Sequence, residues 1–253
     1  MKKTYDCKLL RKQELAPGIF DFVVEAPEIA QNTAPGQFLH VECGGDAFLR
    51  RPISICDTSE REVRFVFEVK GKGTGLLAKN KEGDTVNIMG PLGNGFTVSE
   101  KYKYPVLIGG GIGVFPLYKL AKCLSTPEII LGFRSKDRII MEKEFRAVSA
   151  GFQISTDDGS YGYHGYAAAL LEEYISENLC DVIYSCGPMP MLKAVKAVAE
   201  EAGIPCQLSL EQRMGCGIGA CLVCTCETTR TGMEQRARVC KDGPVFWSKE
   251  IVL

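Results

Sequence analysis

A cysteine pattern near the end of the chain constrains its fold and chemistry more than any other feature. Cys216, Cys221 and Cys224 follow a C-x4-C-x2-C spacing, and Cys240 comes after fifteen further residues. Four thiolates with this spacing suit a [2Fe–2S] cluster. Glycines at positions 215, 217 and 219 permit the tight backbone curve that brings N–H groups close to the sulfurs. The sequence therefore predicts a [2Fe–2S] cluster with these four cysteines as its ligands.

Other uses of the cysteines fit the sequence less well. A structural zinc site usually has two CxxC pairs or a Cys/His mixture, and neither of the two histidines is nearby. Disulfide frameworks belong to small secreted domains, and Met1–Tyr5 lack the apolar segment of a signal peptide. Cys226 is the alternative ligand that the spacing leaves open. On a strand leaving the loop it points to the same side as Cys224, and we expect a spare buried thiol.

Composition narrows the class of protein. The chain has 253 residues, 45% of them hydrophobic, with a net charge of −1. This balance gives no electrostatic case for binding nucleic acid or an anionic membrane surface. The sequence contains no run of eighteen apolar residues, so no transmembrane helix is predicted. Twelve cysteines without a secretion signal indicate a reducing cytoplasm.

Residues 1–100 have the pattern of a small antiparallel β-barrel. Runs of alternating or β-branched residues are separated by Pro-Gly, Gly-Gly and Glu-Gly-Asp turn signals. Short strands at this spacing are typical of a barrel. The expected strands are Phe20–Glu25, Gln37–Glu42, Val63–Val69 and Thr85–Met89.

Two motifs in this region suggest a phosphate-bearing ligand. The tetrapeptide Arg51–Ser54 offers a guanidinium fork that suits a phosphate oxygen. Gly71–Gly75 follows a strand and precedes an expected helix at Leu76–Asn80, an arrangement that presents backbone N–H groups to an anion. Each motif alone is weak, since an arginine is often a surface charge and a glycine loop is often a plain turn.

Together, in a barrel, the two motifs resemble the FAD-binding domain of the ferredoxin reductase superfamily. The resemblance implies that the arginine contacts the pyrophosphate, that the serine lies at the flavin, and that the G-x-G-T backbone contacts the phosphates. It also implies a strand passing along the flavin, and a family linker at Gly90–Gly95. The residues assigned to FAD on this basis are Arg51, Pro52, Ile53, Ser54, Val66, Phe67, Glu68, Gly73 and Thr74.

Residues 101–205 alternate between strand and helix patterns, which predicts a doubly wound α/β domain with a parallel sheet and helices on both faces. The expected strands are Pro105–Ile108, Glu128–Phe133, Phe152–Thr156 and Asp181–Ser185, and the expected helices are Val114–Lys122, Met141–Val148, Tyr166–Ser176 and Met189–Ala202. Ligands bind beyond the carboxyl ends of such strands.

In the reductase superfamily a G-G-G-I-G loop and a C-G-P-x-x-M segment flank the nicotinamide nucleotide, and both are present here. The resemblance implies that this chain binds NAD(H) with Gly109, Gly110, Gly111, Gly113, Cys186, Gly187 and Pro188. The strict G-x-G-x-x-G fingerprint is absent. Cys186 is equally well explained as a small buried residue, and Arg134 leaves the choice between NAD and NADP open.

Residues 206–253 are too few for a hydrophobic core of their own, so we expect the cluster to hold this [2Fe–2S] domain together. Thr231–Met233 is predicted to form a turn and Arg236–Val239 a short strand. The chain has two histidines, His40 and His164, and we expect both to be hydrogen-bonded structural residues.

The whole chain resembles the electron-transfer subunits of NAD-linked, two-flavin dihydroorotate dehydrogenases in its domain order and motifs. The resemblance implies electron transfer from the FMN of a catalytic partner through [2Fe–2S] and FAD to NAD⁺, in a heterotetramer of pyrimidine biosynthesis. A flavin is needed there because a cluster carries one electron and nicotinamide two. No motif offers a base for dihydroorotate, so the chain alone is expected to oxidise NADH and to leave dihydroorotate unchanged. Leu222 and Val223 are candidates for contact with the partner.

Two alternatives stay open. The small flavin subunit of an NADH-dependent ferredoxin–NADP reductase or of a sulfide dehydrogenase shares the domain order. The ending Asp242–Phe246 and the short length favour the dihydroorotate reading, whereas a large glutamate-synthase-like partner favours this alternative. The second alternative is a redox-sensing module without turnover, and the complete nucleotide domain argues against it.

Overall fold

The computed structural model describes residues 3–230 and 235–253. The first part of the chain forms a closed antiparallel barrel with the strand order β1-β2-β5-β4-β3-β6. Its elements are β1 (Thr4–Ala16), β2 (Ile19–Glu25), α1 (Pro27–Ala30), β3 (Phe38–Val41), β4 (Arg51–Thr58), β5 (Glu62–Glu68), α2 (Lys72–Leu77) and β6 (Thr85–Leu92).

Aromatic side chains fill the barrel. Phe22 on β2 lies opposite Phe65 on β5, and its ring centroid lies 5.1 Å from that of Phe67 in an edge-to-face contact. One charge is also buried there: Asp21 is paired with Arg11 at 2.9 Å and with Arg64 at 3.0 Å. These contacts give the barrel a hydrophobic core of its own.

The second part of the fold is a seven-stranded sheet in the order β10-β9-β8-β7-β11-β12-β15, where β15 is Val245–Trp247. Its strands are parallel except β15, which pairs antiparallel with β12. The elements are β7 (Pro105–Gly110), η1 (Gly111–Val114), α3 (Phe115–Cys123), β8 (Glu128–Phe133), η2 (Lys136–Arg138), α4 (Glu142–Arg146), β9 (Gly151–Thr156), β10 (Tyr163–His164), α5 (Ala167–Glu177), β11 (Val182–Cys186), α6 (Met189–Glu201) and β12 (Cys206–Ser209).

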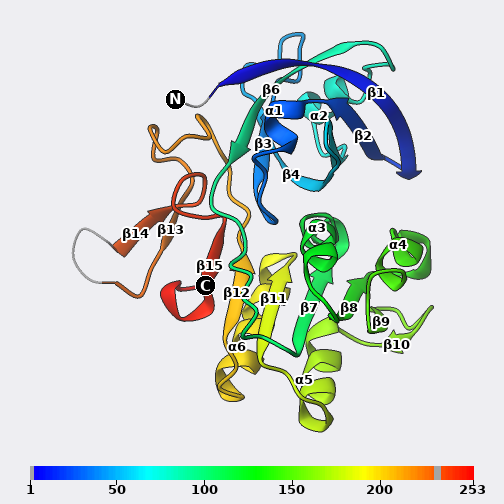
Figure 1. Ribbon diagram of the computed structural model, residues 1–253, viewed down its shortest axis with the longest axis vertical. Coiled ribbons are helices and arrows are strands. Elements are labelled where there is room, and N and C mark those ends of the chain that lie inside the picture. The colour runs from blue at the N-terminus through cyan, green and yellow to red at the C-terminus, as the bar shows by residue number, and fades with distance from the viewer. Residues whose placement is uncertain (1–2, 231–234) are drawn as a thin grey trace.

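Alternation along the parallel strands places helices on both faces of the sheet. On β7, Leu107 packs in the cluster that contains α3 and α4, whereas Ile108 packs in the cluster that contains α5 and α6. Figure 1 shows the barrel and this sheet as two lobes joined by the chain that leaves β6, with the C-terminal segment alongside both.

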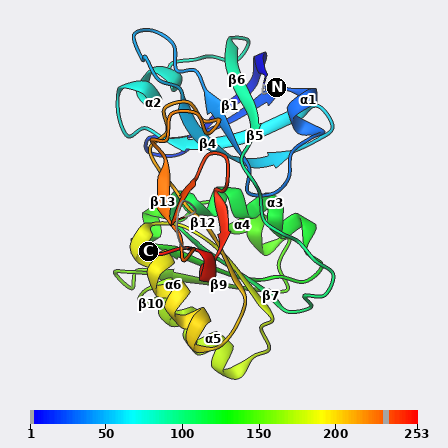
Figure 2. The same ribbon diagram turned by 90° about the vertical axis from the view of Figure 1, so that its left-hand side faces the viewer.

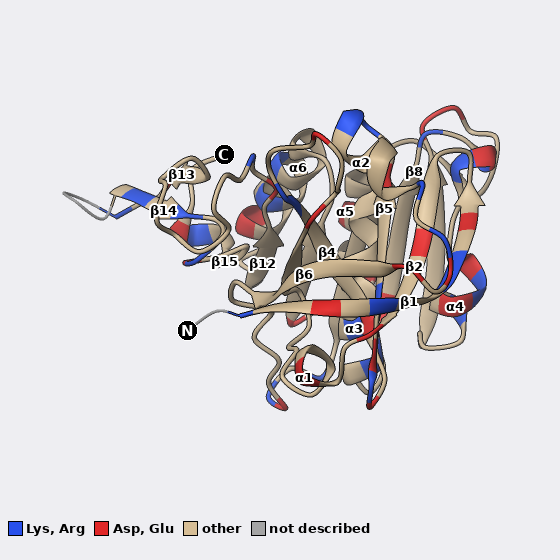
Figure 3. Cartoon of the chain, turned by 90° about the horizontal axis from the view of Figure 1, so that it is seen from above, with Lys and Arg blue, Asp and Glu red and all other residues tan. Residues whose placement is uncertain are grey.

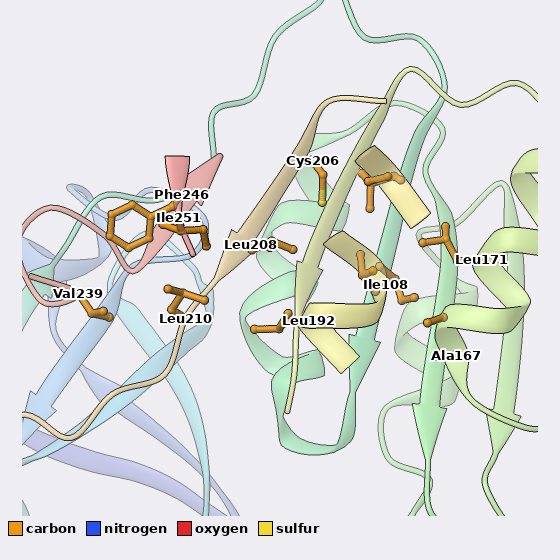
Figure 4. Packing of buried hydrophobic residues seen from close by; sticks show 14 of the residues in the cluster. Ile108, Ala167, Leu171, Leu192, Cys206, Leu208, Leu210, Val239, Phe246 and Ile251 are labelled. Carbon is orange, nitrogen blue, oxygen red and sulfur yellow. The ribbon is translucent and has the colours of Figure 1, made fainter. Parts of the chain in front are cut away.

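The C-terminal segment has little regular structure. Its elements are β13 (Thr225–Glu227), β14 (Arg236–Arg238), β15 (Val245–Trp247) and η4 (Ser248–Glu250). β13 and β14 pair with each other, while β15 is the last strand of the seven-stranded sheet, beside β12. Figure 2 shows the C-terminal segment, coloured orange to red, where the barrel meets the sheet. Phe246 and Ile251 pack beside Leu208 of β12 in one cluster that also contains barrel and α6 residues (Figure 4). The segment is therefore anchored in a core shared with its neighbours.

The predicted fold class is confirmed: a barrel, a doubly wound sheet and a C-terminal segment follow one another. The sequence analysis gave no bounds for β4 and did not predict β1, β10, β12 or β15. The predicted strands in the barrel and the sheet have counterparts within a few residues, and α2 begins at Lys72, four residues before the predicted start. The predicted turn at Thr231–Met233 lies outside the described residues. No helix in the described ranges is long and apolar enough to cross a membrane.

Candidate functional site

A cavity of about 750 Å³ opens where the barrel meets the sheet. Strands β4 and β5 and the start of α2 form its barrel side. Every residue assigned to FAD from the sequence lines it: Arg51, Pro52, Ile53, Ser54, Val66, Phe67, Glu68, Gly73 and Thr74. The two weak motifs therefore lie together in one site although about twenty residues separate them in the sequence.

Arg51 lies directly over the glycine loop. A Cβ added to Gly73 would lie 2.7 Å from Cζ of Arg51, so only glycine lets the guanidinium approach this backbone. Nη1 of Arg51 donates to the carbonyl of Leu49 at 2.5 Å. Thr74 Oγ1 accepts a hydrogen bond from the N–H of Lys70 at 2.9 Å and so holds the loop against the end of β5. A cation and a glycine backbone thus face the same space.

The sheet side of the cavity contains residues that the sequence analysis did not assign. Ile112 and Phe115 follow β7, Ser209 ends β12 and residues 210–214 follow it, and Pro244 directly precedes β15. These lining residues are Ser209, Leu210, Glu211, Gln212, Arg213 and Met214. The signal that would have found them is position, because they come after the carboxyl end of a parallel strand, where ligands bind in such sheets.

Cys186 also lines the cavity, from the end of β11. Burial, and then the negative charge of Glu211, raise the pKa of its thiol to about 12. The thiol is therefore protonated at neutral pH and presents a small, uncharged surface. It is the one residue of the predicted nucleotide set that reaches this cavity among the described residues.

The rest of the predicted nucleotide set forms a close contact between two loops. A Cβ on Gly113 would lie 2.6 Å from Cα of Gly187, and a Cβ on Gly110 would lie 3.1 Å from Cδ of Pro188. A Cβ on Gly109 would lie 2.9 Å from Cδ1 of Leu117 in α3. Gly111 has a φ of +54°, and an added Cβ there would meet no atom within 4 Å. The glycines let the β7 and β11 loops pack at the carboxyl edge of the sheet.

The four predicted ligand cysteines lie together as two pairs. Cys216 and Cys221 interact through their thiols, and the N–H of Cys216 donates to Sγ of Cys221 at 3.4 Å. Cys224 and Cys240 form the other pair, and the N–H of Cys240 donates to Sγ of Cys224 at 3.4 Å. Two thiols for each iron is the arrangement that a [2Fe–2S] cluster requires. Among the described residues no three Cys, His, Asp or Glu side chains converge as ligands of a single ion.

Backbone N–H groups surround these sulfurs. Sγ of Cys216 accepts from Ala220 at 3.3 Å and from Ile218 at 3.5 Å, and Sγ of Cys240 accepts from Gly219 at 3.1 Å. Burial is the largest influence on Cys216 and raises its pKa, but the backbone N–H donors and the Cys221 side chain together outweigh it and lower the pKa to about 6. Donors aimed at sulfur stabilise the thiolate form, which is the form that binds metal.

The loop conformation depends on two glycines. Gly217 and Gly219 have φ angles of +71° and +86°, which other residues adopt at a cost. Arg238 fixes the loop from outside: its Nη1 donates to the carbonyl of Gly219 at 3.3 Å while its Nε donates to Asp242 at 2.9 Å. Cys226 lies beyond the loop on β13, half-buried, opposite Ala237 of β14.

The cysteine loop is adjacent to the cavity. Met214, which lines the cavity, precedes Cys216 by two residues, and Pro244 follows Cys240 by four. Asn94, after β6, donates through its side chain to the carbonyls of Lys241 and Asp242 at 3.2 and 3.1 Å. The barrel, the cavity and the cysteines therefore form one continuous site.

Comparison with known proteins decides the family. The chain is 36% identical over its full length to a protein of Caldanaerobacter subterraneus subsp. tengcongensis named "Dihydroorotate dehydrogenase B (NAD(+)), electron transfer subunit", and the alignment covers all of both chains. A protein of Desulforamulus reducens with the same name is 40% identical, covering 100% of this chain and 99% of its own. The chain belongs to this family. The predicted family is thereby confirmed.

The cysteine segment of this chain has its own match. Residues 211–252 fit the family model of the iron–sulfur cluster binding domain of dihydroorotate dehydrogenase B. Among solved structures, that of an NADH-dependent reduced ferredoxin-NADP oxidoreductase superposes with a TM-score of 0.88 at 33% identity, covering 100% of this chain and 91% of that one. The flavohemoglobin of Malassezia yamatoensis, at 21% identity and a TM-score of 0.65, covers 79% of this chain and 57% of its own and shares the fold.

The cysteine loop of this chain carries exposed apolar side chains. Leu222 is 61% exposed and Val223 56% exposed, and Ile218 in the same loop is also exposed. Leu222 has a φ of +59°, which is uncommon for a residue with a branched side chain. These residues expose apolar surface on the loop that carries three of the four predicted ligands.

The two histidines of the subunit have different surroundings. His164, on β10, is exposed. His40, on β3, is 1% exposed, and neither imidazole nitrogen has a hydrogen-bond partner among the described residues. Burial, and then the charge of Arg50, lower the pKa of His40 to about 4, so it is neutral at pH 7. The backbone carbonyls of Arg50 and Cys216 act on the imidazole as weak acceptors, but neither makes a hydrogen bond of normal geometry.

Proposed function

We propose that this chain carries electrons from the FMN of a dihydroorotate-oxidising partner subunit to NAD⁺. The two kinds of subunit would form a heterotetramer with two copies of each. The observation that carries the proposal is the contact between the cysteine loop and the cavity, because electron transfer between two redox groups requires that they be close. Full-length similarity to the named electron transfer subunits supports the substrate assignment.

The residues of the cavity fit FAD. Its volume of about 750 Å³ is in the range of small-molecule sites. The Arg51 guanidinium over the Gly73 backbone suits a pyrophosphate, since a planar fork can bind two phosphate oxygens at once. We assign the residues of β4, β5 and α2 named above to FAD, with Ser54 beside the flavin ring.

The residues of the cysteine loop fit a [2Fe–2S] cluster. Two thiol pairs and convergent N–H donors supply the ligands and the hydrogen bonds that such a cluster takes. We assign Cys216, Cys221, Cys224 and Cys240 as ligands. Cys226 is left out because it lies on β13, where it pairs with Ala237 of β14, and it packs against the shared hydrophobic core.

NAD(H) is assigned to the carboxyl edge of the sheet. Gly110, Gly113, Gly187 and Pro188 form the close contact between loops there, with Gly109 and Gly111 beside it, and Cys186 connects this edge to the cavity. When bound, the cluster carries single electrons, the flavin converts between one- and two-electron transfer, and nicotinamide takes a hydride. The chain positions these groups, and the neutral Cys186 thiol leaves the reacting face uncharged.

The partner subunit is expected to contact the surface outside the cysteine loop. Leu222 and Val223 place exposed apolar area where a second redox protein must come close. The proposed compartment is the cytoplasm, whose reducing conditions keep thiols available for the cluster.

The first test uses the chain purified alone with its cofactors. NADH is expected to drive reduction of an artificial electron acceptor, whereas dihydroorotate is expected to give none. Addition of the FMN subunit is expected to create dihydroorotate-dependent reduction of NAD⁺. Oxidation of dihydroorotate by the isolated chain would contradict this division of labour.

A second candidate is supported by the structural similarity to the NADH-dependent reduced ferredoxin-NADP oxidoreductase. In that case the chain would serve a different large subunit with the same cofactor set. The discriminating experiment is the same mixture with reduced ferredoxin and NADP⁺ in place of dihydroorotate. Turnover with those substrates and none with dihydroorotate would favour the second candidate.

A further inference from the structure

His40 lies between the flavin cavity and the cysteine loop. On β3 it is paired across the sheet with Pro52, which lines the cavity. On its other side a Cβ added to Gly217 would lie 2.6 Å from Nδ1 of His40. The glycine thus lets the loop close onto the imidazole, one residue after Cys216.

The imidazole is a buried polar group whose hydrogen bonding is weak. Neither nitrogen makes a hydrogen bond of normal geometry among the described residues, and the backbone carbonyls of Arg50 and Cys216 act on the ring as weak acceptors. A neutral imidazole has one N–H donor, and a buried donor left unpaired is unfavourable. Natural proteins rarely keep such a group without a ligand or a function that uses it.

Binding of a [2Fe–2S] cluster would add sulfur atoms as hydrogen-bond acceptors in the cysteine loop. The described hydrogen bonds of the loop use backbone N–H groups as donors toward thiols. Thiolates and inorganic sulfides of a cluster would add further acceptors to the loop whose Gly217 closes onto His40. Hydrogen bonds to sulfur raise the reduction potential of a cluster, because the reduced form carries one more negative charge.

We infer that His40 donates an N–H hydrogen bond to a sulfur of the [2Fe–2S] cluster, raises the reduction potential of the cluster and joins it to the wall of the flavin cavity. This inference rests on the proposed function, since it requires a cluster in the cysteine loop. It assigns a role to the one buried histidine, which the four cysteine ligands and the FAD residues do not use.

The test compares the midpoint potential of the cluster in the full chain with its cofactors, followed by EPR during a redox titration. We expect His40→Phe to lower the potential by about 59 mV, which is a tenfold change in the equilibrium constant of a one-electron couple. His40→Gln keeps a neutral N–H donor and is expected to restore part of the shift. His164→Phe, at the exposed histidine, is the matched control and is expected to leave the potential unchanged.

A second measurement uses the unaltered sequence, so that it does not depend on whether a variant folds. Pulsed EPR of the reduced cluster in protein labelled with ¹⁵N-histidine is expected to show coupling to one histidine nitrogen. A reduced-cluster signal without that coupling overturns the role of His40 and leaves the proposed function intact. Absence of any [2Fe–2S] signal from the full chain contradicts the proposed function, and the inference with it.

Discussion

The barrel of β1–β6 encloses its own hydrophobic core, whereas the cysteine segment after β12 packs into a core that its neighbours supply. Phe22, Phe65 and Phe67 fill the barrel, while Phe246 of the segment needs Leu208 of β12 to be buried. The barrel side of the cavity is therefore supported by the barrel's own hydrophobic core. The cysteine site is held by loop glycines, N–H donors and contacts with the other two parts, so its order depends on what the thiols bind.

The largest expected effect concerns the ligands. Cys224→Ser removes a buried thiol of the second pair, and we expect nearly complete loss of the cluster while the FAD stays bound. Iron content and the flavin absorbance of the purified protein measure the two separately. Cys226→Ser is the matched control in the same segment, and we expect it to keep its iron. Loss of both cofactors in Cys224→Ser would show that the two regions are not independent.

The next effect tests the barrel. Phe22→Ala opens a void beside Phe65 and Phe67, and large-to-small changes of this kind cost about 3–5 kcal/mol of unfolding free energy. Urea denaturation, followed by flavin and by cluster absorbance, is expected to show flavin release at lower urea than cluster loss. Phe48→Ala, at a side chain that is 97% exposed, is the control. Coincident transitions in every variant would mean a single cooperative unit.

The strands of the barrel and the sheet could be predicted where apolar and polar residues alternate, or apolar residues cluster, within a single strand. β1 was not predicted because charged residues of both signs are interspersed along it (Figure 3), and Cys7 and Leu9 are its fully buried residues. β12 and β15 were not predicted because they are short and because their pairing joins Leu208 to Phe246, far apart in the chain. Such a pairing leaves no local pattern.

The candidate site divides in the same way. The cysteine spacing and the Arg51–Ser54 motif are local patterns, and the structure brings their residues together in the expected places. The lining by residues 209–214 and the position of His40 beside Gly217 depend on three-dimensional packing alone. The assignment of each residue to FAD, NAD(H) or the cluster stays a prediction.

A smaller effect tests the preformed cavity wall. Arg51→Ala removes the guanidinium over Gly73, and loss of a hydrogen bond to a charged group, worth about 1.5–3 kcal/mol, is expected to weaken FAD binding tenfold to a hundredfold. Flavin fluorescence during dialysis or dilution measures the affinity. Arg51→Lys keeps the charge without the planar fork and is expected to fall between the two. Unchanged FAD affinity in Arg51→Ala would remove the phosphate role from this residue.

The smallest effect is expected where the barrel contacts the cysteine segment. Asn94→Ala removes the side-chain hydrogen bonds to the carbonyls of Lys241 and Asp242, and each such bond contributes about 0.5–1.5 kcal/mol. We expect faster cluster loss in air, with flavin content unchanged. Asn32→Ala, which removes a side-chain bond within the α1 region, serves as the control. Equal cluster lifetimes in both variants would show that this contact does not support the cysteine site.

The central claim is that one chain connects two redox partners through the cavity and the cysteine loop. The most direct measurement is an anaerobic titration of the chain in complex with its FMN subunit, with dihydroorotate and separately with NADH, followed by visible absorbance. The account predicts that either reductant bleaches both the flavin and the cluster bands. Bleaching by NADH alone would contradict the dihydroorotate assignment, and failure of both reductants would contradict electron transfer altogether.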